Sequence, residues 1–209
     1  MINNSMKASA ISLGCMRMAK LDEKSVDAIM DTALENGINY FDHADIYGKG
    51  DSEVLFGEYL ARHAGIRDKI FIQTKCAIHD GQYDFSKEHI LKSAEGILKR
   101  LNVEYLDSLL LHRPDALMEP EEVAEAFDIL ESSGKVRHFG VSNHNPSQIQ
   151  LLKKCVKQPI EANQLQFGLG HSSMIRSGME VNTLFDGATD RDGGVLNYCR
   201  LHDITIHTW

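Results

Sequence analysis

Residues 37–48 of the chain read GINYFDHADIYG, and this stretch combines the end of a helix, a strand and a polar loop. Apolar residues recur with helical spacing over residues 26–34, so Gly37 is placed where a left-handed glycine ends a helix. A short β-prone run, residues 38–41, follows at once, and polar residues come directly after it. The stretch therefore predicts one helix-to-strand step with polar side chains at the carboxyl end of the strand.

The same step recurs along the chain. We predict seven strands, at residues 10–13, 38–41, 69–74, 106–111, 136–141, 161–166 and 204–209. Their starts lie roughly 25 to 45 residues apart, which is typical of βαβ units, and helical patterns fill the connections. The alternation predicts a parallel sheet covered by helices. Residues 167–194, rich in Gly, Ser, Asp and Thr, are predicted to form a long substrate-facing loop.

Two architectures fit this order of elements, an open doubly wound sheet and a closed eight-stranded barrel. No Gly-x-Gly-x-x-Gly sequence follows the first predicted strand, which weakens the dinucleotide-binding doubly wound alternative. We therefore predict an α/β fold of the TIM-type (β/α)8 barrel. It is expected as a single domain over residues 1–209, incomplete at the C-terminus, with about seven strands and an end within or just after the seventh.

The composition excludes several classes of function. Hydrophobic residues make up 43% and charged residues 25% of the chain, as in ordinary globular domains. Because 30 acidic residues outnumber 22 basic ones, the net charge of −8 argues against a nucleic acid partner. No apolar run is long enough to predict a membrane partner. The four cysteines form no Cys-x-x-Cys pair and suggest reduced thiols, so we expect a cytoplasmic protein.

Chemically active side chains collect at the same end of strand after strand. Asp42 ends the second predicted strand and Tyr47 lies in the loop after it, while Lys75 follows the third strand and His112 the fourth. In a barrel these positions ring one mouth, the face on which barrel enzymes place their sites. The later strands continue the pattern with Ser142, Asn143, Gln164 and Trp209.

Five segments in this order resemble the aldo-keto reductase family: FDHADIYG at 41–48, IQTK at 72–75, LLHRPD at 110–115, GKVR with GVSN at 134–143, and ANQ at 162–164. The resemblance implies an oxidoreductase that reduces aldehyde or ketone carbonyls with NADPH, with NADH as the alternative cofactor. It implies four catalytic residues, Asp42, Tyr47, Lys75 and His112. It also implies that the nicotinamide is held by Ser142, Asn143 and Gln164 and stacked on by Trp209.

The residue types suit this chemistry. A carbonyl that accepts a hydride becomes an alkoxide, so a proton donor must stand over its oxygen. The pKa of tyrosine is about 10, and the Lys75 cation is expected to lower the pKa of Tyr47. Asp42 is expected to keep Lys75 charged, and His112 to orient the oxygen of a small carbonyl substrate.

Two other functions stay open at this point. Four residues near the same mouth could ligate a metal in a barrel hydrolase, namely His43, Asp45, His112 and His144. No close metal-binding spacing supports this reading, so we expect no metal, and zinc would leave Lys75 without a role. The second alternative is a nicotinamide-binding regulatory module without catalysis.

The pattern stops in its seventh strand, whereas members of the resembled family continue with an eighth strand and further helices. The loops after strands seven and eight usually supply the phosphate site of a barrel. We therefore expect a C-terminally truncated member that binds the cofactor poorly, which leaves its activity open. Two unclosed sheet edges also predict self-association.

Overall fold

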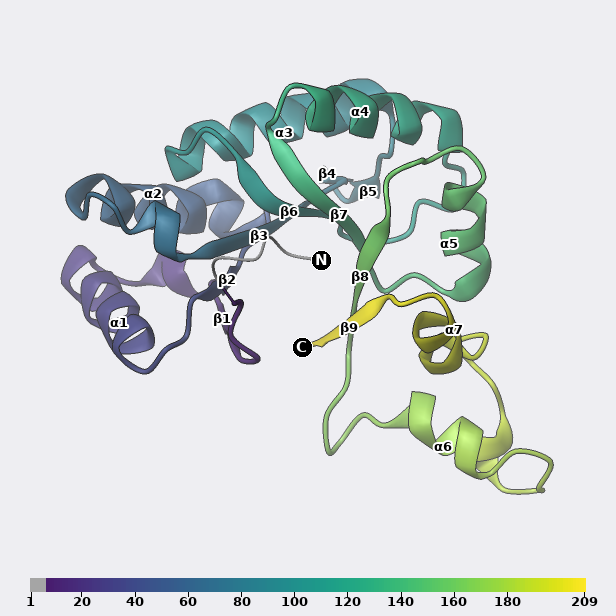
Figure 1. Ribbon diagram of the computed structural model, residues 1–209. Coiled ribbons are helices and arrows are strands. Elements are labelled where there is room, and N and C mark those ends of the chain that lie inside the picture. The colour runs from purple at the N-terminus through teal and green to yellow at the C-terminus, as the bar shows by residue number, and fades with distance from the viewer. Residues whose placement is uncertain (1–6) are drawn as a thin grey trace.

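A computed structural model describes residues 7–209, so the first six residues of the predicted domain lie outside the described part. Seven strands form one parallel sheet in the order β1-β2-β3-β6-β7-β8-β9. The strands are β1 (Ser12–Gly14), β2 (Tyr40–Asp42), β3 (Phe71–Cys76), β6 (Leu106–Leu111), β7 (Val136–Ser142), β8 (Ile160–Leu165) and β9 (Thr205–Thr208). The sheet curls into an incomplete barrel with helices along its outer side (Figure 1).

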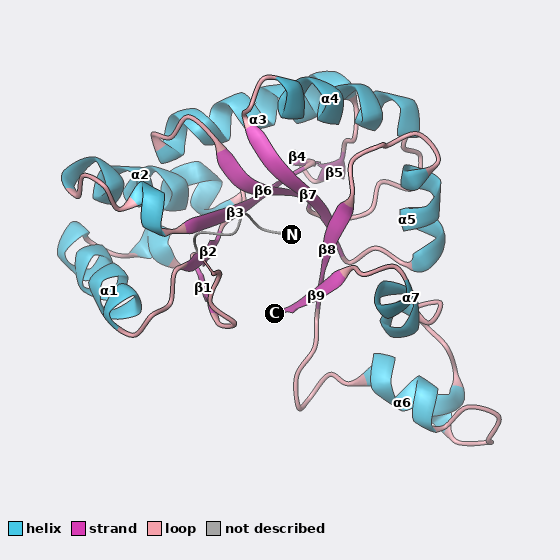
Figure 2. Ribbon diagram, viewed as in Figure 1, coloured by secondary structure: helices cyan, strands magenta, loops and turns pink. Residues whose placement is uncertain are grey.

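Within the described residues 7–209, seven α-helices connect or follow the strands (Figure 2). They are α1 (Glu23–Glu35), α2 (Asp51–Arg62), α3 (Lys87–Leu101), α4 (Pro120–Ser132), α5 (Pro146–Lys153), α6 (Ser173–Met179) and α7 (Val195–Leu201). Short 3-10 turns lie at η1 (Met18–Lys20), η2 (Tyr47–Gly50), η3 (Arg67–Lys69) and η4 (Asp186–Ala188). The strands of the sheet pair in chain order, whereas a doubly wound sheet reverses its order at a switch point, so the barrel prediction is confirmed.

The first helix shows how the sequence sets the element boundaries. Asp22 accepts a hydrogen bond from the Ser25 backbone N–H at 2.8 Å and so caps the start of α1. Gly37 has a φ of +74° and follows the helix end, and its N–H donates to Leu34. The predicted glycine stop is therefore confirmed, because a left-handed residue here closes the last turn.

Side chains alternate between the two faces of the sheet. On β2 and β3, Phe41 and Ile72 are fully buried in the apolar core, whereas Asp42 and Gln73 hydrogen-bond to each other inside the curled sheet. Further along the sheet, Phe139 on β7 stacks on Phe127 of α4 with ring centroids 4.1 Å apart. The outer face of the sheet is thus a conventional apolar core, and its inner face carries buried polar groups.

The connections differ most from expectation. Residues 167–194 contain the short helix α6 and the turn η4, so this segment is only partly the loop that we predicted. After β3 the chain forms a two-stranded antiparallel ribbon, β4 (Ile78–His79) with β5 (Gln82–Tyr83), which the sequence pattern did not indicate. Within residues 7–209, no helix combines the length and the apolar character that crossing a bilayer requires.

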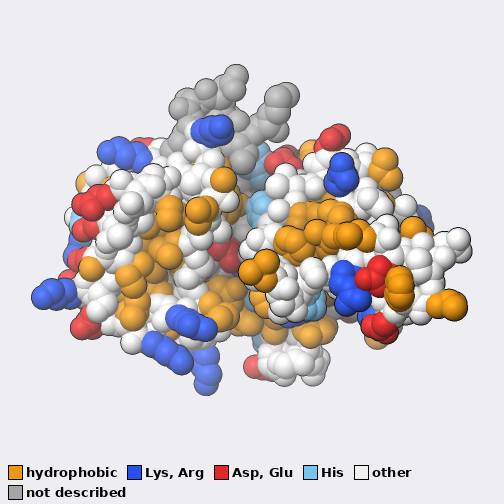
Figure 3. All heavy atoms as spheres, turned by 90° about the horizontal axis from the view of Figure 1, so that it is seen from below, with side chains coloured by type: hydrophobic (Ala, Val, Ile, Leu, Met, Phe, Trp, Pro, Cys, Tyr) orange, Lys and Arg blue, Asp and Glu red, His pale blue; other side chains and the backbone are white. Residues whose placement is uncertain are grey.

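The two ends of the sheet face each other across an opening. Among residues 7–209, β1 pairs only with β2, and β9 only with β8. A cavity of about 520 Å³ lies at the amino ends of the strands, and residues 8–12 and 205–208 contribute to its lining. Hydrophobic side chains show on both sides of the molecule in the view from below (Figure 3).

Candidate active site

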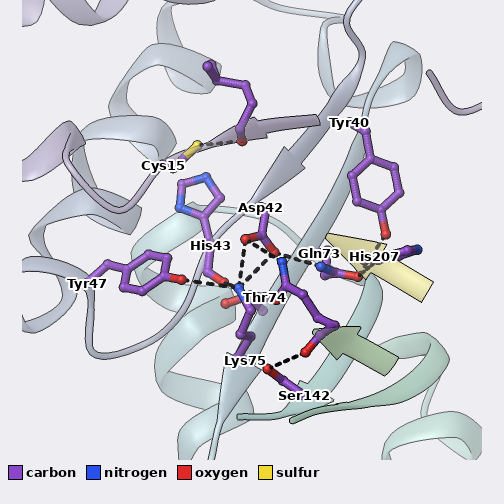
Figure 4. Close-up of polar contacts among 12 residues, drawn as sticks. Cys15, Tyr40, Asp42, His43, Tyr47, Gln73, Thr74, Lys75, Ser142 and His207 are labelled. Atoms are coloured by element: carbon purple, nitrogen blue, oxygen red, sulfur yellow. Dashed lines mark hydrogen bonds and ion pairs between the residues drawn. The ribbon is translucent and has the colours of Figure 1, made fainter. Parts of the chain in front are cut away.

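A buried ion pair on β2 and β3 forms the centre of the site. The Lys75 ammonium nitrogen lies 2.8 Å from each carboxylate oxygen of Asp42 and donates to the His43 carbonyl oxygen at 2.7 Å (Figure 4). Lys75 is 1% exposed. Because an isolated charge at this depth would be strongly disfavoured, the pair depends on this full set of partners.

Asp42 accepts further hydrogen bonds from two glutamine amides. Gln73 Nε2 lies 2.6 Å from Oδ1, and Gln164 Nε2 on β8 lies 3.1 Å from Oδ2. Burial alone would raise the pKa of Asp42, but Lys75 and these donors outweigh it and hold the pKa below its usual value. Burial also lowers the pKa of Lys75, against the opposing field of Asp42.

Tyr47 reaches this pair from the loop that follows β2. Its hydroxyl oxygen lies 3.4 Å from Lys75 Nζ. The next residues keep the loop tight, since Gly48 has a φ of +59° and a Cβ there would lie 2.2 Å from the Cβ of Ala19. Lys49 also adopts a left-handed backbone, with a φ of +58°. This turn presses the loop against η1 and aims the phenol at the ammonium group.

The pKa of Tyr47 corrects our expectation. We expected Lys75 to lower it, yet burial and the negative charge of Asp42 raise the pKa of Tyr47 above its usual value. The physical reason is that burial disfavours the tyrosinate, and that both carboxylate oxygens of Asp42 lie 2.8 Å from Lys75 Nζ, so the negative charge of Asp42 opposes the effect of the ammonium group on Tyr47. Tyr47 therefore holds its proton at neutral pH.

His112 completes the group at the end of β6. Its ring lies edge-on to the Tyr47 ring, with centroids 6.0 Å apart. Burial, with help from the charges of Lys75 and Arg113, lowers the pKa of His112 to about 4. The ring is therefore neutral at pH 7 and carries one N–H. Its Nδ1 is buried and has no hydrogen-bond partner among residues 7–209.

The residues predicted to hold a nicotinamide follow on β7 and β8. Ser142 donates to the Gln164 carbonyl oxygen at 3.1 Å, and Asn143 Nδ2 donates to Ser142 Oγ at 2.8 Å. Gln164 differs from the expectation in one respect, because its amide nitrogen is already bonded to Asp42. The side-chain amide oxygens of Asn143 and Gln164 are not hydrogen-bonded to any described residue, so both can accept a bond from a ligand.

Trp209 follows β9 at the same end of the sheet. Its side chain is half-exposed, and the Arg113 guanidinium lies 5.8 Å from its ring. This contact places Trp209 beside the residue that follows His112. Two open amide oxygens and a half-exposed flat ring fit a planar group that carries an amide, which is the chemistry of a nicotinamide.

Three polar residues of the interior were missed by the sequence reading. Tyr40 and His207 both donate to Gln73 Oε1, at 2.9 and 3.1 Å (Figure 4). A signal for them exists, because Tyr40 lies two residues before Asp42, and Gln73 two residues before Lys75, on strands that alternate with a period of two. Both positions therefore face inward with the ion pair.

The four residues considered for a metal site do not come together. The His43 ring packs edge-on against Phe56, with centroids 4.6 Å apart, and the His144 ring stacks on Phe85 at 5.8 Å. Within the described range 7–209, no three His, Cys, Asp or Glu side chains are arranged to hold one metal ion. The metal-dependent hydrolase alternative therefore finds no support.

Comparisons with known proteins agree with this geometry. Residues 10–209 match the family model of the aldo/keto reductase family. The oxidoreductase YcsN of Bacillus subtilis is 38% identical over 192 residues, which cover 87% of this chain and 59% of that protein. The oxidoreductase YdhF of Escherichia coli is 39% identical over 166 residues, covering 76% of this chain and 56% of that protein.

Solved structures give the same result. The glycerol dehydrogenase AKR11B4 from Gluconobacter oxydans superposes with a TM-score of 0.79 and 25% identity, over 98% of this chain and 60% of that one. The holo form of the aldo-keto reductase AKR11C1 from Bacillus halodurans gives a TM-score of 0.74 and 27% identity, over 96% of this chain and 61% of that one. The chain thus spans about 60% of the length of these relatives. It belongs to the aldo/keto reductase family.

Proposed function

We propose that this chain carries the carbonyl-reducing site of an NADPH-dependent aldo-keto reductase. One observation carries the proposal: the Tyr47 hydroxyl lies 3.4 Å from an ammonium group that Asp42 locks in place from the other side. This arrangement sets one phenol beside one fixed positive charge at the end of the barrel strands. A regulatory module that only binds nicotinamide would have no use for that contact.

Tyr47 acts as the proton donor in this mechanism. The substrate carbonyl oxygen lies against the Tyr47 hydroxyl and takes its proton as negative charge develops on it. An alkoxide is a stronger base than a tyrosinate, so the transfer is favourable even though the pKa of Tyr47 is raised. The tyrosinate that remains lies beside Lys75, whose positive charge stabilises it.

His112 orients the same oxygen. Because its ring is neutral at pH 7, one ring nitrogen can donate a hydrogen bond without competing for the proton that Tyr47 delivers. Its ring lies edge-on to Tyr47, so the two donors approach one oxygen from different directions.

The open side of the site is assigned to the cofactor. Asn143 and Gln164 would hold the carboxamide through their side-chain oxygens, with Ser142 supporting Asn143, and Trp209 would cover the nicotinamide ring. When bound, the nicotinamide supplies the hydride that reduces the carbonyl carbon. The choice of NADPH over NADH rests on the family resemblance, and both are to be tested.

The experiment is reduction of an aromatic and a short-chain aldehyde with NADPH and with NADH. Tyr47→Phe is expected to lower turnover by about 10²- to 10⁴-fold, the usual contribution of a positioned proton donor. Tyr83→Phe on the exposed ribbon is the matched control and is expected to leave turnover unchanged. A Tyr47→Phe protein with the parent's turnover would remove Tyr47 as the acid.

The proposal extends to the state of the protein in solution. Among residues 7–209, β1 and β9 each pair with one strand only, so their other edges offer backbone donors and acceptors to a second copy, and self-association is expected to cover them. Light scattering over a range of concentrations tests this, and a monomer at every concentration contradicts it. The four cysteines are free thiols, which supports a cytoplasmic location.

A further inference from the structure

Gln73 lies inside the curled sheet, two residues before Lys75 on β3. Both the nitrogen and the oxygen of its side-chain amide are hydrogen-bonded. On one side Nε2 donates to Asp42 Oδ1 at 2.6 Å. On the other side Oε1 accepts from the Tyr40 hydroxyl at 2.9 Å and from His207 Nδ1 at 3.1 Å. Gln73 is 1% exposed. The side chain therefore has no freedom to turn without losing several hydrogen bonds at once.

The partners fix which way the amide points. The Asp42 carboxylate can only accept, so the amide nitrogen must face it. The oxygen then faces Tyr40 and His207, and the Nδ1 atom of His207 carries the proton in this arrangement. Three strands contribute, since Tyr40 is on β2, Gln73 on β3 and His207 on β9 (Figure 4).

The Tyr40 and His207 side chains also support each other. Their rings lie edge-on with centroids 5.7 Å apart, and Tyr40 stacks on Phe71 at 6.1 Å. Both donors are thus held by packing as well as by their bonds to Gln73. Because Tyr40 and His207 are held in place, they fix the Gln73 amide, and a fixed amide in turn positions the charged group that it binds.

We propose that Gln73 is a positioning residue for carbonyl reduction, which acts through Asp42 to hold Lys75 against Tyr47. The carboxylate can turn about its last bond, and Lys75 contacts both of its oxygens. Gln73 binds Oδ1 and Gln164 binds Oδ2, so the two amides fix the carboxylate plane from both ends. This inference rests on the proposed function, in which Gln164 also serves the cofactor, whereas Gln73 has no role in binding the cofactor.

The test compares Gln73→Met with Tyr40→Phe, and uses Gln82→Met on the exposed ribbon as the matched control. Gln73→Met keeps the length of the side chain but removes the donor to Asp42. Losing a hydrogen bond to a charged group is expected to lower kcat by about 10- to 100-fold, with the KM for NADPH nearly unchanged. Tyr40→Phe removes one of the two donors to Gln73 Oε1 and leaves both His207 and Asp42 in place, so a smaller loss of kcat in the same direction is expected.

The pH profile separates positioning from a general loss of structure. Because a donor to the carboxylate favours its charged form, Gln73→Met is expected to raise the pKa of Asp42 and to move the acidic limb of kcat to higher pH. Gln82→Met is expected to leave both limbs in place. A Gln73→Met protein with the parent's kcat and the parent's pH profile would overturn the proposal.

A second readout does not depend on turnover. The ¹³C resonance of the Asp42 carboxyl, assigned with Asp42→Asn, reports its titration in the folded protein. If Tyr47→Phe is fully active, the proposed acid is wrong, yet a shifted Asp42 titration in Gln73→Met still supports the role of Gln73. Should Gln73→Met fail to fold, Tyr40→Phe decides, and a titration and kcat equal to the parent's overturn the proposal.

Discussion

The two sides of the candidate site differ in how many of their polar groups are hydrogen-bonded within the protein. On the β2 and β3 side, the side-chain donors and acceptors of Asp42, Gln73 and Lys75 all have partners in the protein. On the β7 to β9 side, the side-chain oxygen of Asn143 has no hydrogen-bond partner among residues 7–209, and half of the Trp209 side chain is exposed. The difference teaches that the chain satisfies the polar groups of the β2 and β3 side by itself, whereas in the proposed function a ligand completes the other side.

The segments that carry the two sides differ in the same way. The loop with Tyr47 is four residues of tight turn at η2, pressed against η1. The segment between β8 and α7 is long, and its side chains Leu169, Leu184 and Phe185 are largely exposed. One side is thus held by short local contacts, and the other carries apolar groups that the described residues do not cover.

The largest effect is expected when the buried ion pair on the β2 and β3 side is broken. Lys75→Met leaves the Asp42 carboxylate buried without its cation, so we expect a loss of about 3–5 kcal/mol of unfolding free energy together with turnover. Asp42→Asn combined with Lys75→Met removes both charges and is expected to recover most of the stability but none of the turnover. Urea unfolding measures the first effect, and a Lys75→Met protein as stable as the parent would contradict it.

A second test concerns the carboxyl group of Asp45, which lies just outside the group formed by Asp42, Gln73 and Lys75. Asp45 Oδ1 is buried and has no partner within residues 7–209. Burial and the charge of Glu53 raise the pKa of Asp45 to about 7, against the attraction of Arg100. A carboxyl whose folded pKa is raised contributes stability below its unfolded pKa, near 3.8, and loses it as the pH rises to about 7.

Asp45→Asn therefore removes a cost that exists only at high pH. One pKa unit corresponds to about 1.4 kcal/mol, and partial exposure reduces the full value, so we expect the variant to be more stable than the parent by about 2 kcal/mol at pH 8. The difference should vanish near pH 4. Chemical unfolding at both pH values measures it, with Asp51→Asn at the exposed start of α2 as the control for loss of one charge. A gain that does not change with pH would contradict this assignment.

The smallest effect on stability is expected in the exposed segment between β8 and α7. Leu184→Ser and Phe185→Ser alter side chains that are mostly exposed, so the unfolding free energy should change by no more than about 0.5 kcal/mol. Phe139→Ala on β7 is the contrasting variant, because Phe139 is buried against Phe127 and its loss should cost about 3–5 kcal/mol. A large loss at Leu184 or Phe185 would show that this segment is packed more firmly than the comparison implies.

Much of the fold could be predicted because the strands leave strong patterns. The strand at Leu106–Leu111 has the predicted bounds, since its run of apolar residues is buried and bounded by polar turns. Helix α6 at Ser173–Met179 could not be predicted in the same way. It buries no residue, so no apolar stripe marks it in the sequence, and the side chain of its N-cap residue Ser172 makes no capping hydrogen bond.

The candidate site also combines features that the sequence predicts with features that it does not. Asp42, Tyr47 and Lys75 meet because strand ends in a parallel barrel share one face, and this rule needs only the order of elements. The sign of the shift in the pKa of Tyr47 depends on burial and on the negative charge of Asp42 nearby, and sequence spacing reveals the size of neither effect. Gln73 lies inside the IQTK segment, but it was missed because the resemblance implies a role only for Lys75 there, and its bonds to Asp42, Tyr40 and His207 join strands far apart in the sequence.

The hydrogen bond from Gln164 to Asp42 has a consequence for how the chain matures during synthesis. The two residues are 122 positions apart, whereas Lys75 is only 33 positions from Asp42. At a synthesis rate of about 5–20 residues per second, the ion pair can form several seconds before β8 has left the ribosome. Until then one side of the carboxylate must remain hydrated. The Asp42 carboxylate can therefore exchange this hydration for the Gln164 amide only when β8, the sixth strand of the sheet, has emerged.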